Sequence, residues 1–156
     1  MVSSSRVDVV EGFGSAELFA QVQMFYARQM RLLDEGRVEE WAATFTEEGV
    51  FAADARPEPA RGRAVIAAAA GAAWERLVAS GVRHRHWLGM VEVGAESGGR
   101  VRSRCYALVL AVPRGGPVSV QVSTVCEDVL VRGGGGGWLV EERSVRRDDL
   151  GEVGAG

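Results

Sequence analysis

The stretch VRHRHWLGMVEVGAESGGRVRSRCYALVLAVP, residues 82–113, decides the fold class. Two long runs rich in β-branched and other apolar residues, 82–93 and 100–112, stand on either side of Gly98-Gly99. Runs of this composition joined across glycines are typical of a β-hairpin. We therefore predict two long antiparallel strands that pair with each other.

The rest of the C-terminal half follows the same pattern. Runs 117–131 and 138–146 are also strand-like and are joined through the five glycines 133–137. Because these glycines connect two strands and precede no helix, they do not form a phosphate-binding loop. Cys105 and Cys126 lie inside strand-like runs, and we expect reduced thiols rather than a disulfide.

Helical periodicity dominates the first half of the chain. Ser15 can cap a helix whose apolar stripe runs to Leu33, before Gly36. Two further helices are predicted over 37–44 and 63–80, with a short strand, 50–53, between them. Helices grouped before strands favour an α+β fold with an antiparallel sheet, and long strands that curl leave room for a pocket.

Length and composition set the broad class. The 156 residues fit a single domain, which we place at 15–147 between flexible tails at 1–14 and 148–156. The net charge of −3 and the lack of a basic patch argue against nucleic acid as a partner. No apolar run is long enough to span a membrane and no signal peptide is visible, so we expect a cytoplasmic protein.

Several local sequences resemble the nuclear-transport-factor-like superfamily. Residues 25–36 are similar to its first helix and turn, 41–51 to its second helix and first strand, and 62–66 to the start of its third helix. This resemblance implies a cone-shaped, curved antiparallel sheet with three N-terminal helices enclosing an apolar pocket. Within the superfamily the chain looks like the SnoaL-like cyclases and dehydratases of actinomycete aromatic polyketide pathways, which implies a small-molecule polyketide substrate and no cofactor.

The run Arg85-His86-Trp87-Leu88-Gly89-Met90 also resembles a strand of scytalone dehydratase. That resemblance implies acid/base catalysis by His86, supported by Asp34 at the end of the first helix. The second catalytic histidine of that enzyme has no counterpart here, since its position falls near Cys105 or Tyr106. The base of ketosteroid isomerases would fall at Ala53, with Asp54 beside it.

The chemistry of the residues agrees with a role for His86. Imidazole exchanges protons near neutral pH, and residues two apart on a strand share a face, so His84 and His86 should point the same way. Leu88 and Met90 continue that face as predicted pocket lining. A solvent-exposed pair, or a buried imidazole bonded to a backbone carbonyl, remains the alternative. A zinc site built on His84 and His86 would need a third ligand, and no candidate lies at a spacing typical of metal sites, so no metal is predicted.

Other side chains are candidates for binding or catalysis. Tyr26 could donate a hydrogen bond to an enolate oxygen, and Tyr106 could polarise the substrate in the same way if it faces the pocket rather than the solvent. Asp54 could fill the position of the isomerase base if the loop shifts by one residue. Core packing or local hydrogen bonding explains most of these positions equally well. Arg143 and Arg146 could bind a carboxylate or a phenolate, but solvent-exposed arginines are the favoured interpretation. The predicted substrate-contacting residues are His84, Trp41, Phe51, Trp74, Trp87, Leu88, Met90 and Ser123.

Three functions remain open from the sequence. The first is a cofactor-independent cyclase or dehydratase acting on an aromatic polyketide. The second is a non-catalytic small subunit, since the β subunits of ring-hydroxylating dioxygenases share this fold. The third is a ligand-binding module. A chain of the second kind would need a large iron-containing partner. We expect a homodimer, because the open face of the sheet offers apolar surface for pairing.

Overall fold

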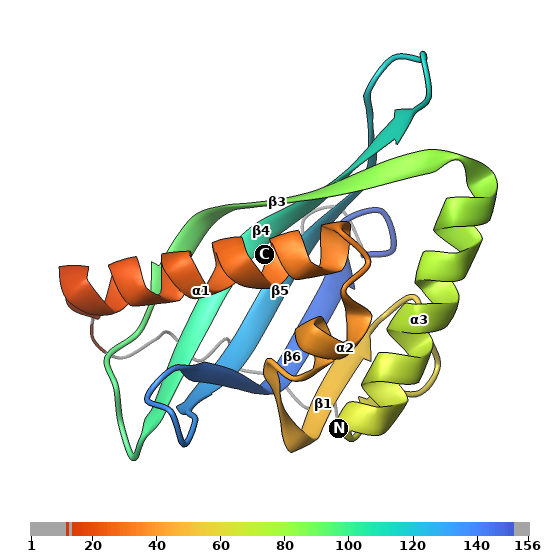
Figure 1. Cartoon of the computed structure of the whole chain (residues 1–156). Helices are drawn as coiled ribbons and strands as arrows, with labels where there is room; N and C mark the ends of the chain where they lie inside the picture. Colours follow the sequence, from red (N-terminus) through yellow and green to blue (C-terminus); the bar gives the residue numbers. More distant parts are fainter. Residues whose placement is uncertain (1–11, 13, 152–156) are drawn as a thin grey trace, which may run out of the picture.

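The computed structural model describes residues 12 and 14–151 and is a helix-covered sheet (Figure 1). The predicted flexible tails, 1–14 and 148–156, lie mostly outside the described residues. The elements in chain order are α1 (Ala16–Asp34), α2 (Val38–Ala42), β1 (Phe45–Ala53), β2 (Ala60–Arg61), α3 (Arg63–Ser80), β3 (Val82–Val93), β4 (Arg100–Pro113), β5 (Ser119–Arg132) and β6 (Trp138–Arg147).

The ends of the helices follow the local sequence. The Ser15 side chain accepts a hydrogen bond from the backbone N–H of Leu18 at 3.1 Å, so it caps α1 as predicted. After α1 the chain turns at Gly36, which has a φ of +75°. The indole of Trp74 lies against Gly36 so closely that no Cβ would fit there. This contact joins the end of α1 to α3.

The six strands form one curved sheet in the order β2-β1-β6-β5-β4-β3. The four C-terminal strands pair as successive antiparallel hairpins, as predicted. The predicted sheet is antiparallel in all its pairs except one, since β1 pairs with β6 in parallel. No hairpin joins these two strands, so nothing forces them to run in opposite directions.

Helix α1 lies along β3 and runs in the opposite direction (Figure 1). At its start, the backbone N–H of Gly14 donates to the carbonyl of Val93 at 2.9 Å. At its end, Asp34 contacts His86 near the other end of β3. The core between helices and sheet contains Val22, Phe45, Val101, Leu130 and Val140, all fully buried.

Two bulges change which side chains face the core. In β3 the pairing register shifts between Gly89 and Glu92, and Met90 has a φ of +51° and is largely exposed. In β6 the register shifts after Val140, and Arg143 is buried. Met90 as pocket lining and Arg143 as a solvent-exposed residue are therefore both wrong, because an extra residue in a strand inverts the alternation beyond it.

No helix in the described part of the chain is both long and apolar enough to cross a bilayer.

Candidate active site

The end of α1 and the middle of β3 meet at Asp34 and His86. One carboxylate oxygen of Asp34, Oδ1, lies 2.6 Å from the Nδ1 atom of His86. The other oxygen, Oδ2, accepts the backbone N–H of the same histidine at 3.1 Å. The Asp34 side chain is 9% exposed and that of His86 is 22% exposed. The carboxylate therefore fixes both the strand backbone and the ring.

This contact determines which nitrogen of His86 can react. A carboxylate oxygen accepts, so Nδ1 carries the proton and Nε2 presents its lone pair. No partner of Nε2 is found among the described residues, and this atom is not one of their buried unpaired atoms. The exposed atom of the ring is thus an oriented base. A carboxylate behind a histidine also stabilises the imidazolium that forms when the base takes a proton.

An open cleft of about 560 Å³ is lined by Asp34 of this pair, while His86 adjoins it through Asp34 and is not itself a lining residue. The end of α3 supplies one wall, with Trp74, Leu77 and Val78. The opposite side is formed by the end of α1 and the start of β3, including Asp34 and His84. Its remaining lining residues are Glu35, Gly81, Val82, Arg83 and Arg85. An apolar wall facing a few polar groups suits a flat organic ligand.

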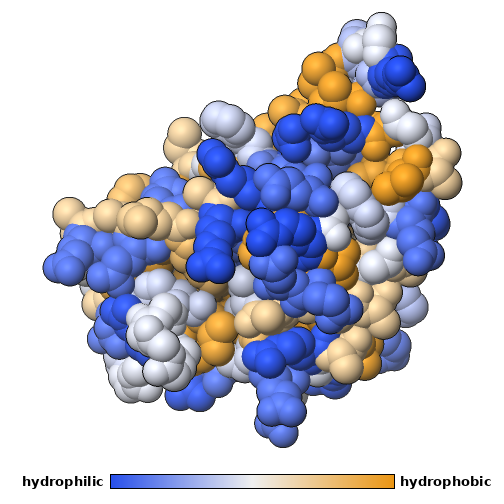
Figure 2. Space-filling model, in the orientation of Figure 1, coloured by the Kyte–Doolittle hydropathy of each residue, from blue (hydrophilic) through white to orange (hydrophobic). Residues whose placement is uncertain are grey.

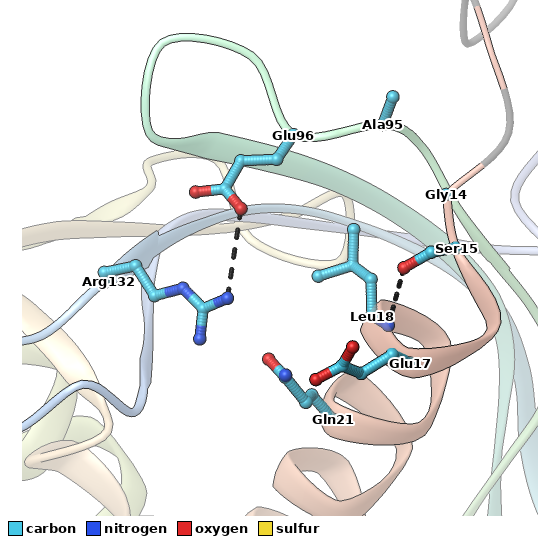
Figure 3. A pocket seen from close by; sticks show the side chains of 8 residues that line it. All are labelled: Gly14, Ser15, Glu17, Leu18, Gln21, Ala95, Glu96 and Arg132. Carbon is cyan, nitrogen blue, oxygen red and sulfur yellow. Dashed lines mark hydrogen bonds and ion pairs between the residues drawn. The ribbon is translucent and has the colours of Figure 1, made fainter.

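A second cleft, of about 360 Å³, opens at the other end of α1 (Figure 3). Glu17 and Gln21 reach it from α1, while Glu96 lies across from Arg132 at 3.9 Å. Its walls are mainly polar and hold no histidine. The cleft beside Asp34 is therefore the better candidate for acid/base chemistry.

Polar side chains rather than a hollow fill the space between the middle of α1 and the sheet. The Tyr26 hydroxyl donates to Asp128 at 2.7 Å and also contacts the Ser103 hydroxyl. Arg143 donates twice to the Asp128 carboxylate, at 2.8 and 2.7 Å, and once to Gln29 at 2.8 Å. We call Tyr26, Gln29, Ser103, Asp128 and Arg143 the buried polar cluster.

Burial and charge decide the ionisation of the cluster. Burial raises the pKa of Tyr26 well above its ordinary value, and the negative charge of Asp128 raises it further. Burial works against the charge of Arg143, but the ion pair with Asp128 keeps the pKa of Arg143 raised. The cluster therefore contains a neutral tyrosine and the Asp128–Arg143 ion pair. The Tyr26 hydroxyl is hydrogen-bonded within the cluster, so it is not free to polarise a substrate.

The predicted residues are divided between three environments. His84 and Trp74 line the cleft, beside the Asp34–His86 pair. Trp41 is buried, and Phe51 and Leu88 pack against the core, so they do not form walls of the cleft. The aromatic rings of Trp41, Phe45 and Phe51 contact one another there.

Four further assignments are wrong. Trp87 and Tyr106 are 67% and 55% exposed on the face of the sheet opposite to the core. Ser123 lies on that face too and donates to Asp148. Asp54 is exposed and accepts the backbone N–H of Arg147, at 3.1 Å to Oδ1 and 3.0 Å to Oδ2. It follows β1, which is separated from β3 by the three strands β6, β5 and β4. Strand alternation explains the first three, since each is one residue out of phase with a core-facing position.

Sequence reasoning missed Leu77, Val78 and most of the buried polar cluster. Leu77 and Val78 lie within the predicted helix 63–80, and only the packing of α3 against β3 places them at a cleft. Asp128 alternates with buried Thr124 and Cys126 on β5. A carboxylate at a core-facing position of a strand requires a buried partner. The position of Asp128 in the sequence could therefore have predicted a buried polar contact.

The described residues contain no group of three or more His, Cys, Asp or Glu side chains placed to hold a metal ion. Cys105 and Cys126 lie opposite each other on β4 and β5 as buried free thiols. Their pairing follows from the register, and no disulfide joins them.

The fold and the site define a class: an α+β protein with a curved sheet, a covering of N-terminal helices and a histidine–carboxylate pair beside a cleft. The chain belongs to the SnoaL-like domain family, whose family model matches residues 15–144. No match was found among curated proteins.

Solved structures agree with this family. A protein from Catenulispora acidiphila, solved in complex with S-DNPA, is 39% identical with a TM-score of 0.78, covering 87% of this chain and 97% of that one. ActVI-ORFA from Streptomyces coelicolor is 32% identical with a TM-score of 0.81, covering 88% and 100%. An NTF2-like protein with a cystatin-like fold from Novosphingobium aromaticivorans is 26% identical with a TM-score of 0.74, covering 89% and 86%. The predicted nuclear-transport-factor-like fold is thereby confirmed.

Proposed function

We propose that this protein is a cofactor-independent cyclase or dehydratase that acts on an aromatic polyketide intermediate, with His86 as its base. The observation that carries the proposal is the contact of Asp34 with both the ring and the backbone N–H of His86 beside an open cleft. Membership of the SnoaL-like domain family and the likeness to ActVI-ORFA support the same kind of chemistry.

The proposed reaction begins at a carbon next to a carbonyl group. Nε2 of His86 removes a proton from this carbon, and an enolate forms. Asp34 stabilises the resulting imidazolium through Nδ1. The enolate then expels a β-hydroxyl group, which takes up a proton from a donor in the cleft and leaves as water; alternatively, the enolate attacks a second carbonyl group and closes a ring. The cleft contributes by holding the substrate in position, which replaces part of the entropy cost of the reaction.

The lining of the cleft supports an aromatic substrate. Trp74 offers a ring on which a flat molecule can stack, and Leu77 and Val78 extend the apolar wall. The related Catenulispora acidiphila protein was solved in complex with S-DNPA, so a 39% identical chain of this fold binds a ligand.

A bicyclic β-hydroxy ketone tests the proposal. 3-Hydroxy-1-tetralone loses water to give 1-naphthol, whose fluorescence reports turnover. We expect turnover by the wild-type protein and a loss of about 100- to 10,000-fold in kcat for His86→Ala. Arg102→Gln, on an exposed side chain of β4, is the matched control and should retain full activity. Unchanged turnover by His86→Ala would refute the role of His86.

A ligand-binding module is the second candidate, because a relative was solved as a ligand complex. This function requires the cleft but not the base. Saturable quenching of tryptophan fluorescence by 1-naphthol that is lost in Trp74→Phe, without turnover of the tetralone, would favour it over the enzyme.

We also propose that the chain forms a homodimer through the outer face of β3 and β4. Trp87, Met90 and Tyr106, which we call the outer sheet patch, are 67%, 78% and 55% exposed. Trp87 pairs with Leu108, and Tyr106 pairs with Gly89, so the two rings lie on neighbouring strands. Large apolar side chains gathered on one face are typical of a protein–protein interface. Hydrophobic residues also gather along the projecting β4–β5 hairpin, next to its hydrophilic tip (Figure 2).

A further inference from the structure

His84 lines the cleft but has no role in the proton removal that we assign to His86. It lies on β3 two residues before His86 and lines the cleft with Asp34 and Trp74. The two histidines share the inner face of the strand, because the bulge of β3 comes later, between Gly89 and Glu92. No hydrogen-bond partner of either ring nitrogen of His84 occurs among residues 12 and 14–151, and neither nitrogen is a buried unpaired atom there.

Loss of water needs a proton donor as well as a base. Asp34 fixes the Nδ1 proton of His86, so Nε2 is the atom that takes up the proton of the carbon. A departing hydroxyl group is a poor leaving group until it is protonated, so a second proton donor beside the reacting bond assists the loss of water.

The other ionisable groups that line the cleft do not suit this task. Arg83 and Arg85 do not release their protons in the working pH range of a protein. Asp34 already accepts two hydrogen bonds from His86. Glu35 has a side chain that is 56% exposed at the rim. The imidazole of His84 is the remaining side chain of the lining that can carry and release a proton.

The spacing of the two histidines fits a substrate held between them. Residues two apart on a strand are separated by about 6.6 Å. Each ring nitrogen approaches a bound oxygen or acidic hydrogen through a contact of about 3 Å. A β-hydroxy ketone can therefore present its acidic carbon to one ring and its hydroxyl group to the other.

We propose that His84 is the general acid that protonates the leaving hydroxyl group, an inference that rests on the proposed function. His86 takes the proton from the carbon, and the electron pair of that C–H bond forms the enolate. The carbonyl re-forms, the electrons of the enolate make the new C=C bond, and the C–O bond breaks as the imidazolium of His84 gives its proton to the oxygen. Water leaves, and the proton now held by His86 returns to His84 through solvent.

Two substrates that differ in their leaving group test this role. 3-Hydroxy-1-tetralone gives 1-naphthol and water, whereas 3-acetoxy-1-tetralone gives 1-naphthol and acetic acid. Acetate departs as a stable anion and needs no proton from the protein. We therefore expect His84→Ala to lower kcat about 100-fold on the hydroxy compound and less than about threefold on the acetoxy compound. His86→Ala should slow both, after subtraction of the uncatalysed rate.

The outcomes separate this inference from the function on which it rests. Equal losses by His84→Ala on the two substrates, or no loss on either, would overturn the acid role and leave the function of His86 standing. Absence of turnover by the wild-type protein on both compounds would overturn the function and the inference together. His84→Gln, which keeps a polar side chain of similar size, should show the same dependence on the leaving group. Its thermal unfolding provides the check that the fold is kept.

Discussion

Asp34 contacts His86 twice, once at the ring nitrogen Nδ1 at 2.6 Å and once at the backbone N–H at 3.1 Å. Fifty-two positions separate the two residues, and they meet because α1 runs along β3 in the opposite direction. The double contact fixes both the position and the tautomer of the imidazole. A single carboxylate thus connects helix packing to the chemistry of the strand.

Asp34→Asn should separate orientation from charge. The amide preserves the shape of the side chain but cannot stabilise an imidazolium, and its NH₂ group can select the wrong tautomer. We expect kcat on 3-hydroxy-1-tetralone to fall about 100- to 10,000-fold with little change in KM. Glu39→Gln, an exposed acidic residue of α2, is the control and should behave like the wild type. Equal activity of the two variants would contradict the role of Asp34.

Asp128→Asn should destabilise the fold strongly. The substitution leaves the buried guanidinium of Arg143 without its counter-ion, and breaking a buried pair in this way costs about 3–5 kcal/mol. Urea unfolding measures the loss. The double variant Asp128→Leu with Arg143→Met removes both charges and should be more stable than Asp128→Asn. A single variant that unfolds like the wild type would mean that the pair is not buried in solution.

The buried Tyr26 should make the free energy of unfolding decrease at alkaline pH. Its folded-state pKa is raised, so the folded protein keeps the phenolic proton at pH values where the unfolded chain has lost it. The tyrosine's contribution is fully present below about pH 10 and is lost as the pH rises above that value, by up to about 1.4 kcal/mol per pH unit.

Chemical unfolding of Tyr26→Phe at pH 9 and pH 11 tests this dependence. The decline between the two pH values should be smaller than in the wild type. Tyr106→Phe removes the exposed tyrosine and is the matched control, which should keep the wild-type decline. An identical decline in all three proteins would show that the phenol of Tyr26 ionises normally.

Gly36→Ala and Gly71→Ala should act in opposite directions. At Gly36 the backbone has a φ of +75° and a Cβ would collide with the ring of Trp74, so we expect a loss of about 1–3 kcal/mol. At Gly71, in the middle of α3, no atom would meet the new Cβ, so we expect a gain of about 0.5–1 kcal/mol. Thermal unfolding of the two variants decides. Destabilisation by both would mean that the surroundings of Gly71 are tighter in solution.

The outer sheet patch should control assembly. We expect the wild type to sediment as a dimer and Trp87→Ser with Tyr106→Ser to sediment as a monomer. Met24→Ser, on a side chain of α1 that is 74% exposed, is the control for loss of exposed apolar surface and should remain dimeric. Equal sedimentation of the wild type and the double variant would place the interface elsewhere or show a monomer.

The sequence by itself determined the order of the three helices and the five longer strands, because periodicity is a local property; the two-residue strand β2, Ala60–Arg61, was not predicted. The predicted third helix agrees with α3, Arg63–Ser80, and the predicted second strand, 82–93, agrees with β3. The two-residue spacing of His84 and His86 also predicted their shared face, since no bulge separates them. The pairing of Asp34 with His86 followed only from a family resemblance, not from any local pattern.

Only the tertiary structure decided which side chains face the core beyond a bulge and where the cleft lies. The bulges at Met90 and before Arg143 each invert the phase of a strand, and they exposed a predicted pocket residue and buried a predicted surface residue. The position of the cleft was likewise set by how α3 packs beside the end of α1. Helices and strands follow from interactions between near neighbours in the chain, whereas bulges and clefts follow from competition among distant segments for the same core.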